Sequence, residues 1–403
     1  MISYMPILSL AAAQRLIVSH SPSLAAEAVP LSEAAGRIAA QAIKSMRPVP
    51  DFARSAMDGY AVNSRYLTAG AEQVTLRVTG EIAAGTTDLP RLTGKSAIAI
   101  MTGGALPPGA NQVVPFERCR RDREVVLVNS PPNPGAFLRA RGADLAAGQT
   151  IVRAGARIEV QHLPLLAESG LAQVSVVGRP ELAIICTGSE LLSTADTPET
   201  GQIIGGNRFL LAALIRGAGA VSRDLGLVAD DCARIVATLK DALHGPSQGV
   251  ITTGGMGPGN YDLLPQAFAE LGIAPLYTAL AVRPGRSTMF GLYKGKPVFA
   301  LPGPPPAVFL LFHELVLPAL RAMQGQRRPL PPLRRAILTT PILLKKTGLL
   351  NLKGAVAGLN GKTLTVRPTR KNEAANAIIH LPANRKHLLA GEEVSLRLCT
   401  PDF

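Results

Sequence analysis

Apolar positions divide the chain into segments with helical spacing and segments with strand spacing. Over residues 9–42 the spacing is helical with a break near Pro22, which predicts two helices, the second with Ser32 as its N-cap. Over residues 48–133 short β-prone stretches alternate with Gly and Pro clusters, and this texture predicts a compact β-rich module. Helical spacing returns at 161–169.

From residue 181 onward, apolar stretches alternate with amphipathic ones. The pattern predicts strands at 182–186, 221–228, 249–252 and 297–300, and helices at 208–217, 231–243, 262–271 and 308–323. Continuous apolar strands that alternate with helices indicate a parallel sheet covered on both faces. A proline-rich joint at 327–332 then precedes β texture that predicts a small terminal barrel or sandwich.

A chain of 403 residues is too long for one ordinary core. We therefore expect a multidomain α/β protein with four parts. They are a helical region made of 1–45 with 140–177, a β-rich domain at 46–139, a parallel-sheet α/β domain at 178–326, and a barrel-like β domain at 327–403.

Composition narrows the classes of partner. Hydrophobic residues make up 47% and charged residues 17%, which excludes disorder as a description of the whole chain. The formal charge of +14 attracts any anion, but the basic residues are scattered and aromatic residues reach only 4% without tryptophan. We therefore expect no nucleic-acid partner.

The N-terminus and the cysteines indicate a cytoplasmic protein. No basic segment precedes the first apolar stretch, and Gln14 and Arg15 interrupt it, so we expect an amphipathic helix and no membrane partner. The four cysteines lack the close pairs that zinc knuckles or redox dithiols need, which fits a reducing cytosol.

Three of the predicted α/β strands end in glycine-rich loops, at 186–190 (CTGSE), 252–259 (TTGGMGPG) and 301–304 (LPGP). Ligands of open α/β sheets bind outside the carboxyl ends of the strands. Glycines there let backbone N–H groups approach phosphate oxygens, and a following helix N-terminus adds a favourable dipole. One such loop is usually only a turn, but three at one edge of a sheet predict an anion site.

Carboxylates follow the same strands, at Glu190, Asp230, Asp231 and Asp262. Beside an anion they suit Mg²⁺, which takes a few carboxylates plus ligand oxygens. Asp231 and Asp262 also begin predicted helices, where an acidic side chain stabilises the helix as a cap. Both interpretations therefore stay open for these two residues.

Charged residues in two turns are further candidates. Arg283 and Arg286 flank a Pro-Gly pair, and two guanidinium groups suit recognition of phosphate or another oxyanion, although a plain surface turn is the alternative. Asp58 lies in a tight turn of the β-rich module before Gly59, and Asp-Gly is common turn chemistry. The residues alone give Asp58 a weak functional claim.

Several motifs resemble the molybdopterin molybdenumtransferases, known as MoeA in bacteria and as the E domain of gephyrin in animals. The most specific signature of that family, SAMDGYAV, is complete at 55–62. The tract IMTGGALPPGA at 100–110 and the loop RGADLAAG at 141–148 are similar to two further family segments. The remaining matches follow in the family's order over nearly the whole chain, at 187–191, Asn207, 228–231, 252–255, 284–285 and 301–303.

The resemblance implies an activity and a set of residues. Members of the family insert molybdate into the dithiolene of adenylylated molybdopterin, with Mg²⁺ as helper, and release AMP. They are elongated four-part homodimers in which the β-rich domain of one subunit closes over the pterin site of the other. Other proteins of cofactor biosynthesis are possible partners by the same resemblance.

The resemblance also implies a role for individual residues of this chain. Asp58, Asp144 and Asp262 would be catalytic, and Glu190, Asp230 and Asp262 would hold the metal. The substrate would be bound by ten residues, which are Thr102, Thr187, Gly188, Asn207, Gly254, Gly255, Arg283, Arg286, Pro302 and Gly303.

The chain departs from the family pattern at several site positions. Ser189 stands where the family usually has an acid, Arg286 replaces a lysine, and Pro304 and Ala307 replace an asparagine and a serine. The residues after Gly255 (Gly257-Pro258-Gly259), the tract Leu263-Leu264-Pro265 and the terminal tract 369–373 also differ.

These departures leave several hypotheses. The first is an active transferase with altered contacts, for molybdate, for tungstate or for a different pterin form. The second is a non-catalytic carrier or scaffold that binds the pterin cofactor. The third is a basic α/β protein with an unrelated nucleotide ligand.

Overall fold

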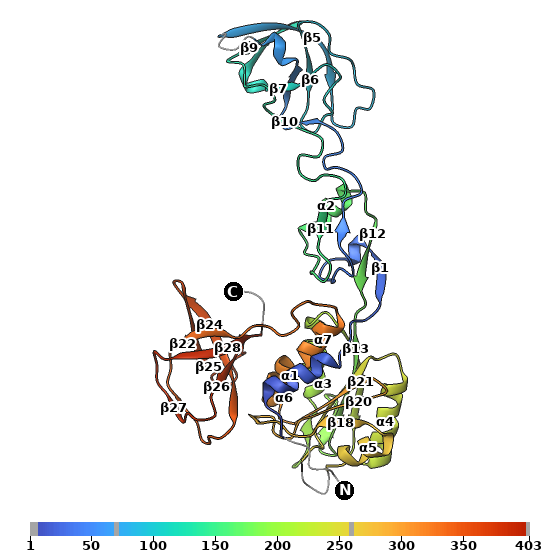
Figure 1. The fold of residues 1–403 in the computed structure, drawn as a ribbon, viewed down its shortest axis with the longest axis vertical. Helices are drawn as coiled ribbons and strands as arrows, with labels where there is room; N and C mark the ends of the chain where they lie inside the picture. Colours follow the sequence, from blue (N-terminus) through green and yellow to red (C-terminus); the bar gives the residue numbers. More distant parts are fainter. Residues whose placement is uncertain (1–6, 68–71, 258–261, 400–403) are drawn as a thin grey trace. The chain divides into compact units, whose positions relative to one another are not determined.

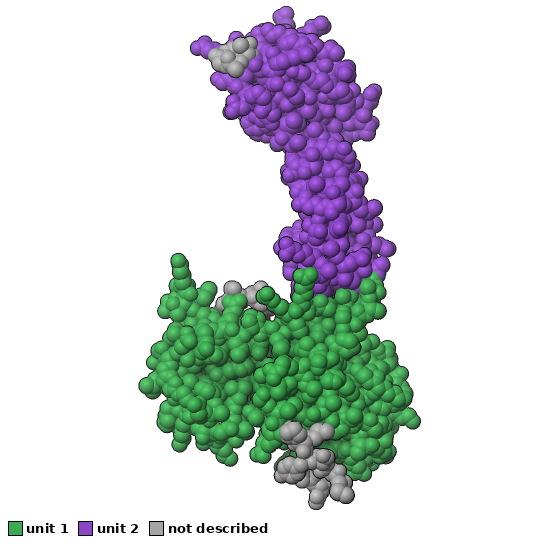
Figure 2. All heavy atoms as spheres, in the orientation of Figure 1, with its two compact units in different colours: residues 1–27, 177–403 green, residues 28–176 purple. Residues whose placement is uncertain are grey.

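The structure is a computed structural model that describes residues 7–67, 72–257 and 262–399 (Figure 1). The chain forms two compact units, which Figure 2 shows in different colours. Unit 1 consists of residues 1–27 and 177–403, and unit 2 consists of residues 28–176.

The centre of unit 1 is a six-stranded sheet with the order β16-β13-β17-β21-β20-β18. Its first four strands, Val221–Val228, Glu181–Thr187, Gly249–Thr253 and Lys296–Leu301, are parallel, as the sequence predicts. The last two, β20 (Met289–Tyr293) and β18 (Ala274–Tyr277), run antiparallel, so the sheet is mixed and the predicted parallel strands form four of its six strands. The two-residue turn at Lys294 and Gly295, with φ of 48° and 83°, folds β20 directly onto β21.

Alternate strand residues of this sheet face two separate cores. On one face Ile184 and Phe299 pack with α1 (Leu10–Ser19), α3 (Asn207–Gly217), α6 (Pro305–Leu311), the π-helical turn η4 (Phe312–Val316) and α7 (Leu317–Met323). On the other face Ile185 and Val298 pack with α4 (Cys232–His244) and α5 (Leu264–Leu271). This is the two-sided cover that continuous apolar strands require.

One described helix, Pro305–Met323, is long and apolar enough to cross a membrane. In the structure 78% of its apolar window is buried inside the protein. It is therefore a core helix of unit 1.

The C-terminal part of unit 1 is a closed β-barrel of five strands. They are β22 (Arg334–Leu338), β24 (Leu350–Asn360), β25 (Thr363–Pro368), β26 (Ala377–Leu381) and β28 (Glu393–Leu398). β24 pairs with both β25 and β26, and β22 and β28 complete the circle, which confirms the predicted barrel. Short strands flank it, at β19 (Val282–Arg283), β23 (Ile342–Leu343) and β27 (His387–Leu388).

Unit 2 contains the predicted β-rich module. Its six-stranded sheet has the order β7-β4-β6-β5-β9-β8. In chain order the strands are β4 (Gly59–Val62), β5 (Gln73–Ile82), β6 (Ser96–Ile100), β7 (Gln112–Pro115), β8 (Cys119–Asp122) and β9 (Val125–Asn129). Beside it, β3 (Arg54–Ser55) pairs with β10 (Leu138–Arg139).

The predicted helical region is mostly extended chain. After α1 the chain forms β1 (Ala26–Pro30), a 3-10 turn (Leu31–Glu33) and β2 (Ile43–Lys44), so the second predicted helix is wrong. Pro30, not Ser32, is at the cap position of that turn. Instead, β1 pairs with β12 (Gln173–Val177) and β2 pairs with β11 (Thr150–Val152). The helix predicted near 161–169 is present as α2 (His162–Glu168). The division into four domains stays a prediction.

Candidate functional site

The carboxyl ends of four neighbouring strands meet at one edge of the central sheet. In the strand register Thr187 lies opposite Val228, and Thr253 lies opposite both Cys186 and Leu301. We call the loops that follow these strands, 188–190, 229–231, 254–257 and 302–304, the rim. The sequence prediction that the glycine-rich loops share one edge is confirmed.

Two glycines of the rim have positive φ and lie close to Thr187 at the end of β13. Gly254 has φ +91°, and a Cβ atom built there would lie 2.3 Å from the carbonyl oxygen of Thr187. A Cβ atom on Gly255, at φ +59°, would lie 3.0 Å from the Thr187 hydroxyl. The double glycine therefore lets the loop after β17 cross directly over the end of β13.

The loops after β13 and β16 are tied together by side chains. The backbone N–H of Ser189 donates to Oδ2 of Asp230 at 2.9 Å, and the backbone N–H of Asp230 donates to Oγ of Ser189 at 2.9 Å. The carboxylate of Glu190 folds back over Gly188, where an added Cβ would lie 2.5 Å from Oε2 of Glu190. Two of the predicted metal ligands thus belong to adjacent loops.

Asn207, the first residue of α3, links the loops after β17 and β21. Its Nδ2 donates to the carbonyl of Gly303 at 2.7 Å and lies 3.5 Å from Oγ1 of Thr253. Its Oδ1 is buried and has no hydrogen-bond partner within the described part of the chain. A buried acceptor of this kind is stabilised by a ligand that donates a hydrogen bond to it.

The two aspartates with alternative interpretations behave differently. Asp231 is the N-cap of α4 and accepts the backbone N–H of Arg234 at 2.8 Å, which confirms its capping role. Asp262 does not cap α5, because the helix begins at Leu264 and the carboxylate accepts the N–H of Gly257 at 2.6 Å. The predicted start of that helix at 262 was wrong by two residues, and Pro258 and Gly259 lie outside the described residues.

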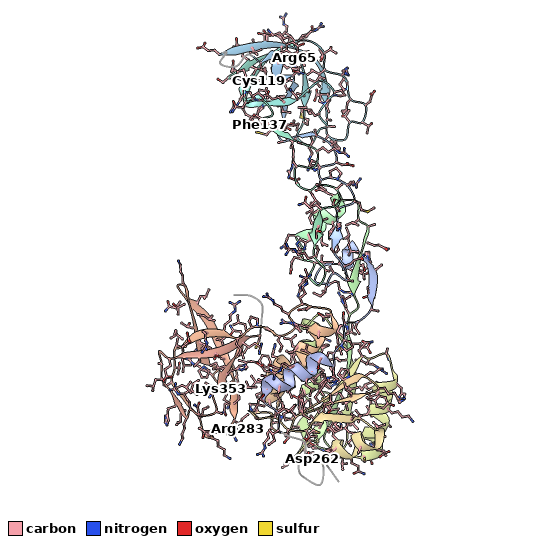
Figure 3. The ribbon with its side chains drawn as sticks, viewed as in Figure 1. Arg65, Cys119, Phe137, Asp262, Arg283 and Lys353 are labelled. Atoms are coloured by element: carbon pink, nitrogen blue, oxygen red, sulfur yellow. The ribbon has the colours of Figure 1, made fainter. Side chains whose placement is uncertain are left out.

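The arginine pair lies at and just after the end of the strand that joins the barrel. Arg283 is in β19, which pairs with barrel strand β24, and in the view of Figure 3 it lies between Lys353 of the barrel and Asp262. Nη1 of Arg283 is buried without a described partner, and Arg286 is exposed. Among the described residues no hydrogen bond or ion pair joins either guanidinium group to the rim, so the expected position of the pair near the rim has no support from the described contacts.

Two predicted catalytic residues belong to unit 2. Oδ1 of Asp58 accepts the backbone N–H of Thr102 at 2.6 Å and its hydroxyl at 2.7 Å, and these bonds, the backbone one first, lower the pKa of Asp58. Oδ1 of Asp144 accepts hydrogen bonds from Nη2 and Nε of Arg139, at 2.6 and 3.2 Å, and this pairing raises the pKa of Arg139. Each acid is thus held by a neighbour in its own unit.

The described residues contain no group of three acidic, histidine or cysteine side chains that could by itself hold a metal. Asp230 and Asp262 each already accept a backbone N–H with one oxygen. Mg²⁺ is commonly bound by one or two carboxylates together with substrate phosphates rather than by an all-protein cage. The donor chemistry of Glu190 and Asp230 fits that mode, and the three-residue metal assignment stays a prediction.

Comparisons with known proteins identify the family. Residues 8–170 match the model of the MoeA N-terminal region (domain I and II), and residues 183–322 match that of a probable molybdopterin binding domain. Molybdopterin molybdenumtransferase 2 of Mycobacterium tuberculosis (strain ATCC 25618 / H37Rv) is 30% identical over 398 residues, which are 95% of this chain and 97% of that protein. The chain belongs to the molybdopterin molybdenumtransferase family.

Other members of the molybdopterin molybdenumtransferase family agree over the full length. The molybdopterin molybdenumtransferase of Staphylococcus aureus (strain MSSA476) is 30% identical over 396 residues, covering 96% of this chain and 94% of that protein. Two solved structures of a molybdopterin biosynthesis MoeA protein from Pyrococcus horikoshii are similar, with TM-scores of 0.82 and 0.79 and identities of 29% and 28%. Each alignment covers 98% of this chain and 100% of the other, which confirms the multidomain α/β fold.

The structure adds two hydroxyl groups at or beside the rim that the sequence pattern does not indicate. At Ser189, where the sequence shows only the loss of an acid, the hydroxyl accepts a hydrogen bond from the backbone N–H of Asp230. The hydroxyl of Thr253, which contacts Asn207, received no role. Thr253 belongs to the tract TTGG, which the sequence singles out, but the side of the strand that its hydroxyl faces is known only once the sheet is formed.

Proposed function

We propose that this protein inserts molybdate into the dithiolene of adenylylated molybdopterin and releases AMP, in the cytoplasm. The observation that carries the proposal is the rim, where four aligned strand ends present glycine loops and carboxylates at one edge. The full-length relatives are molybdopterin molybdenumtransferases by name. All four cysteines are free thiols, as a reducing compartment requires.

The rim binds the substrate through backbone and side-chain groups. Within the loops at 188–190 and 254–257, the backbone N–H groups of Gly188, Ser189, Gly254 and Gly257 are used inside the chain. Those of Glu190, Gly255 and Met256 donate to phosphate oxygens, with Thr187, Pro302 and Gly303 beside them. The buried Oδ1 of Asn207 accepts a hydrogen bond from the ligand. Glu190 and Asp230 would hold Mg²⁺ together with those phosphates, and the ion would supply positive charge that offsets the charge of the phosphates.

The carboxylates supply the proton chemistry. Asp262 lies beside the rim, and its orientation is set by the N–H of Gly257. A second subunit supplies Asp58 and Asp144 from its own unit 2. The hydrogen bonds from Thr102 favour the ionised form of Asp58, so this acid accepts a proton or orients water during hydrolysis of the adenylate.

One structural observation favours the transferase over a carrier. Ala307, where the family usually has a serine, is a residue of α6 that is 4% exposed and packs in the core. The missing hydroxyl therefore removes no group from the exposed surface of the rim. At Ser189 a hydroxyl still accepts a hydrogen bond where the family usually has an acid.

Titration with adenylylated molybdopterin and Mg²⁺, followed by molybdate with AMP quantified, tests the proposal. We expect tight binding and molybdate-dependent release of AMP. Asp262→Ala should bind substrate without releasing AMP, whereas the matched variant Asp231→Ala, which removes only the helix cap of α4, should retain release.

The same titration has two informative contrary outcomes. Binding without AMP release under both molybdate and tungstate would make the protein a carrier or scaffold. Release with tungstate in preference to molybdate would change the metal substrate but keep the reaction.

A further inference from the structure

We propose a second ligand site, separate from the rim, that takes a small organic anion with an apolar body. The site is a cavity of about 450 Å³ in unit 1, where α1 faces the C-terminal barrel. Cavities of roughly 300–1,000 Å³ are typical of small-molecule sites. Nothing in the proposed transfer of molybdenum uses this cavity.

The cavity has apolar walls from two parts of the fold. Leu10 of α1 lies on one side, and Leu350, Leu388 and Val394 of the barrel region lie on the other. Leu10, Leu388 and Val394 are each less than 9% exposed, so their positions are held by packing. The free energy of an apolar ligand body falls when it leaves water to contact such walls.

The cavity also carries an excess of positive charge. Arg335 and Arg385 line it, whereas Glu393 is its one lining carboxylate among the described residues. Arg335 is 3.5 Å from Glu393 with both side chains more than half exposed, and Arg385 is paired at the surface with Glu392. Exposed ion pairs are weak, so the guanidinium group of Arg335 is able to turn toward an anionic ligand. Arg385 contacts both carboxylate oxygens of Glu392 and donates to the carbonyl of His387, and it adds positive charge beside the ligand.

The surrounding charge draws anions to the cavity. Residues 327–403 contain fourteen Lys and Arg residues and four Asp and Glu residues. This segment therefore carries most of the net charge of +14. A field of one sign raises the local concentration of small ions of the other sign. The ligand therefore carries a carboxylate, sulfonate or phosphate group.

The floor of the cavity is a fixed polar cluster. Glu314 of η4 is fully buried and accepts hydrogen bonds from Gln14 at 2.8 Å, His380 at 2.8 Å and Arg397 at 3.0 Å. All three donors line the cavity. Because Glu314 neutralises Arg397, the charge available to a ligand comes from Arg335 and Arg385 at the mouth.

Fluorescence titration with 8-anilinonaphthalene-1-sulfonate, an apolar ring system with one anionic group, tests the site. We expect saturable binding at one site per chain. The double variant Arg335→Ala/Arg385→Ala should weaken binding about tenfold or more, since each charged contact contributes strongly. Ala11→Trp, at an exposed position of α1 that lines the cavity, should block it.

The matched control is Lys362→Ala, which removes one positive charge from the barrel turn after β24, outside the cavity lining. It should bind the probe as the native chain does. Unchanged binding in Ala11→Trp would overturn the site. Loss of probe binding in Ala11→Trp together with unchanged binding in Arg335→Ala/Arg385→Ala would overturn the proposed selectivity of the site for anions. Thermal unfolding of each variant confirms that the fold is intact.

Discussion

Ser189 and Asp230 bind each other by two reciprocal hydrogen bonds, each from a backbone N–H to the other residue's side chain at 2.9 Å. The pair connects the loops that follow β13 and β16. A hydroxyl at 189 makes this connection without adding a negative charge beside Asp230 and Glu190. The departure from the family pattern at this position therefore preserves a contact and removes a charge.

Replacement of Ser189 should test that pair. Ser189→Ala leaves the N–H of Asp230 without its acceptor, and we expect a loss of roughly 1 kcal/mol of stability and a several-fold higher KM for adenylylated molybdopterin. Ser189→Thr, which keeps the hydroxyl, is the control. Steady-state AMP release gives KM and kcat for both variants. A lower kcat with an unchanged KM in Ser189→Ala would contradict a purely positioning role for Ser189.

Gly254→Ala should destabilise unit 1 by about 2 kcal/mol or more. The φ of +91° disfavours any Cβ, and the added atom would lie 2.3 Å from the Thr187 carbonyl. Gly303→Ala is the matched control at the same rim, because nothing lies within 4 Å of an added Cβ there. Urea unfolding measures the difference, and equal losses in the two variants would refute the steric argument.

Thr102→Val should shift the acid limb of the pH-activity profile upward. The variant keeps the backbone N–H that is the larger cause of the lowered pKa of Asp58, and it loses the hydroxyl donor that is the second cause. The pKa of Asp58 therefore rises, and the ionised form is lost at a higher pH than in the native protein. Thr102→Ser should restore the profile. An acid limb that does not move in the valine variant would remove Asp58 from the proton chemistry.

Glu314→Gln should cost about 3–5 kcal/mol of stability, because it leaves Arg397 buried without its counter-charge. Adding Arg397→Met to this variant removes the uncompensated charge and should recover part of the loss. Chemical unfolding of the two variants and the native chain forms the comparison. A double variant less stable than Glu314→Gln would show that Arg397 stabilises the barrel mainly through other contacts.

His313 should make stability depend on pH. Burial lowers the pKa of His313 from 6.5 to about 4, so between these values the unfolded chain binds a proton that the folded chain does not. Stability contributed by neutral His313 is therefore present above pH 6.5 and decreases as the pH falls toward 4, by up to about 1.4 kcal/mol per pH unit. His313→Leu should lack this component in unfolding measurements at pH 4.5, 5.5 and 7.5. If the free energy of unfolding changes with pH in the same way for the variant and the native chain, His313 is not the source of the pH dependence.

The four parallel strands of the central sheet were predictable, and three of them, β13, β17 and β21, are largely apolar and buried. β16 and α4 appear where the pattern places them, and Asp231 takes the capping role that was one of its two interpretations. The antiparallel strands β18 and β20 were not predicted, since an apolar pattern contains no information about strand direction. The second N-terminal helix failed because strand pairing with β12 and β11 outweighed a weak local preference.

By itself the sequence determined the family and the glycine-rich strand ends, and it offered a helix cap as one of two roles for Asp231. These features depend on residues a few positions apart, whose geometry the local backbone sets. Only the tertiary structure decided which residues meet across distance, such as Ser189 with Asp230, or Glu314 with Gln14 and Arg397. Such contacts depend on how whole elements pack, because residues 300 positions apart are brought together by the shared core and not by their spacing.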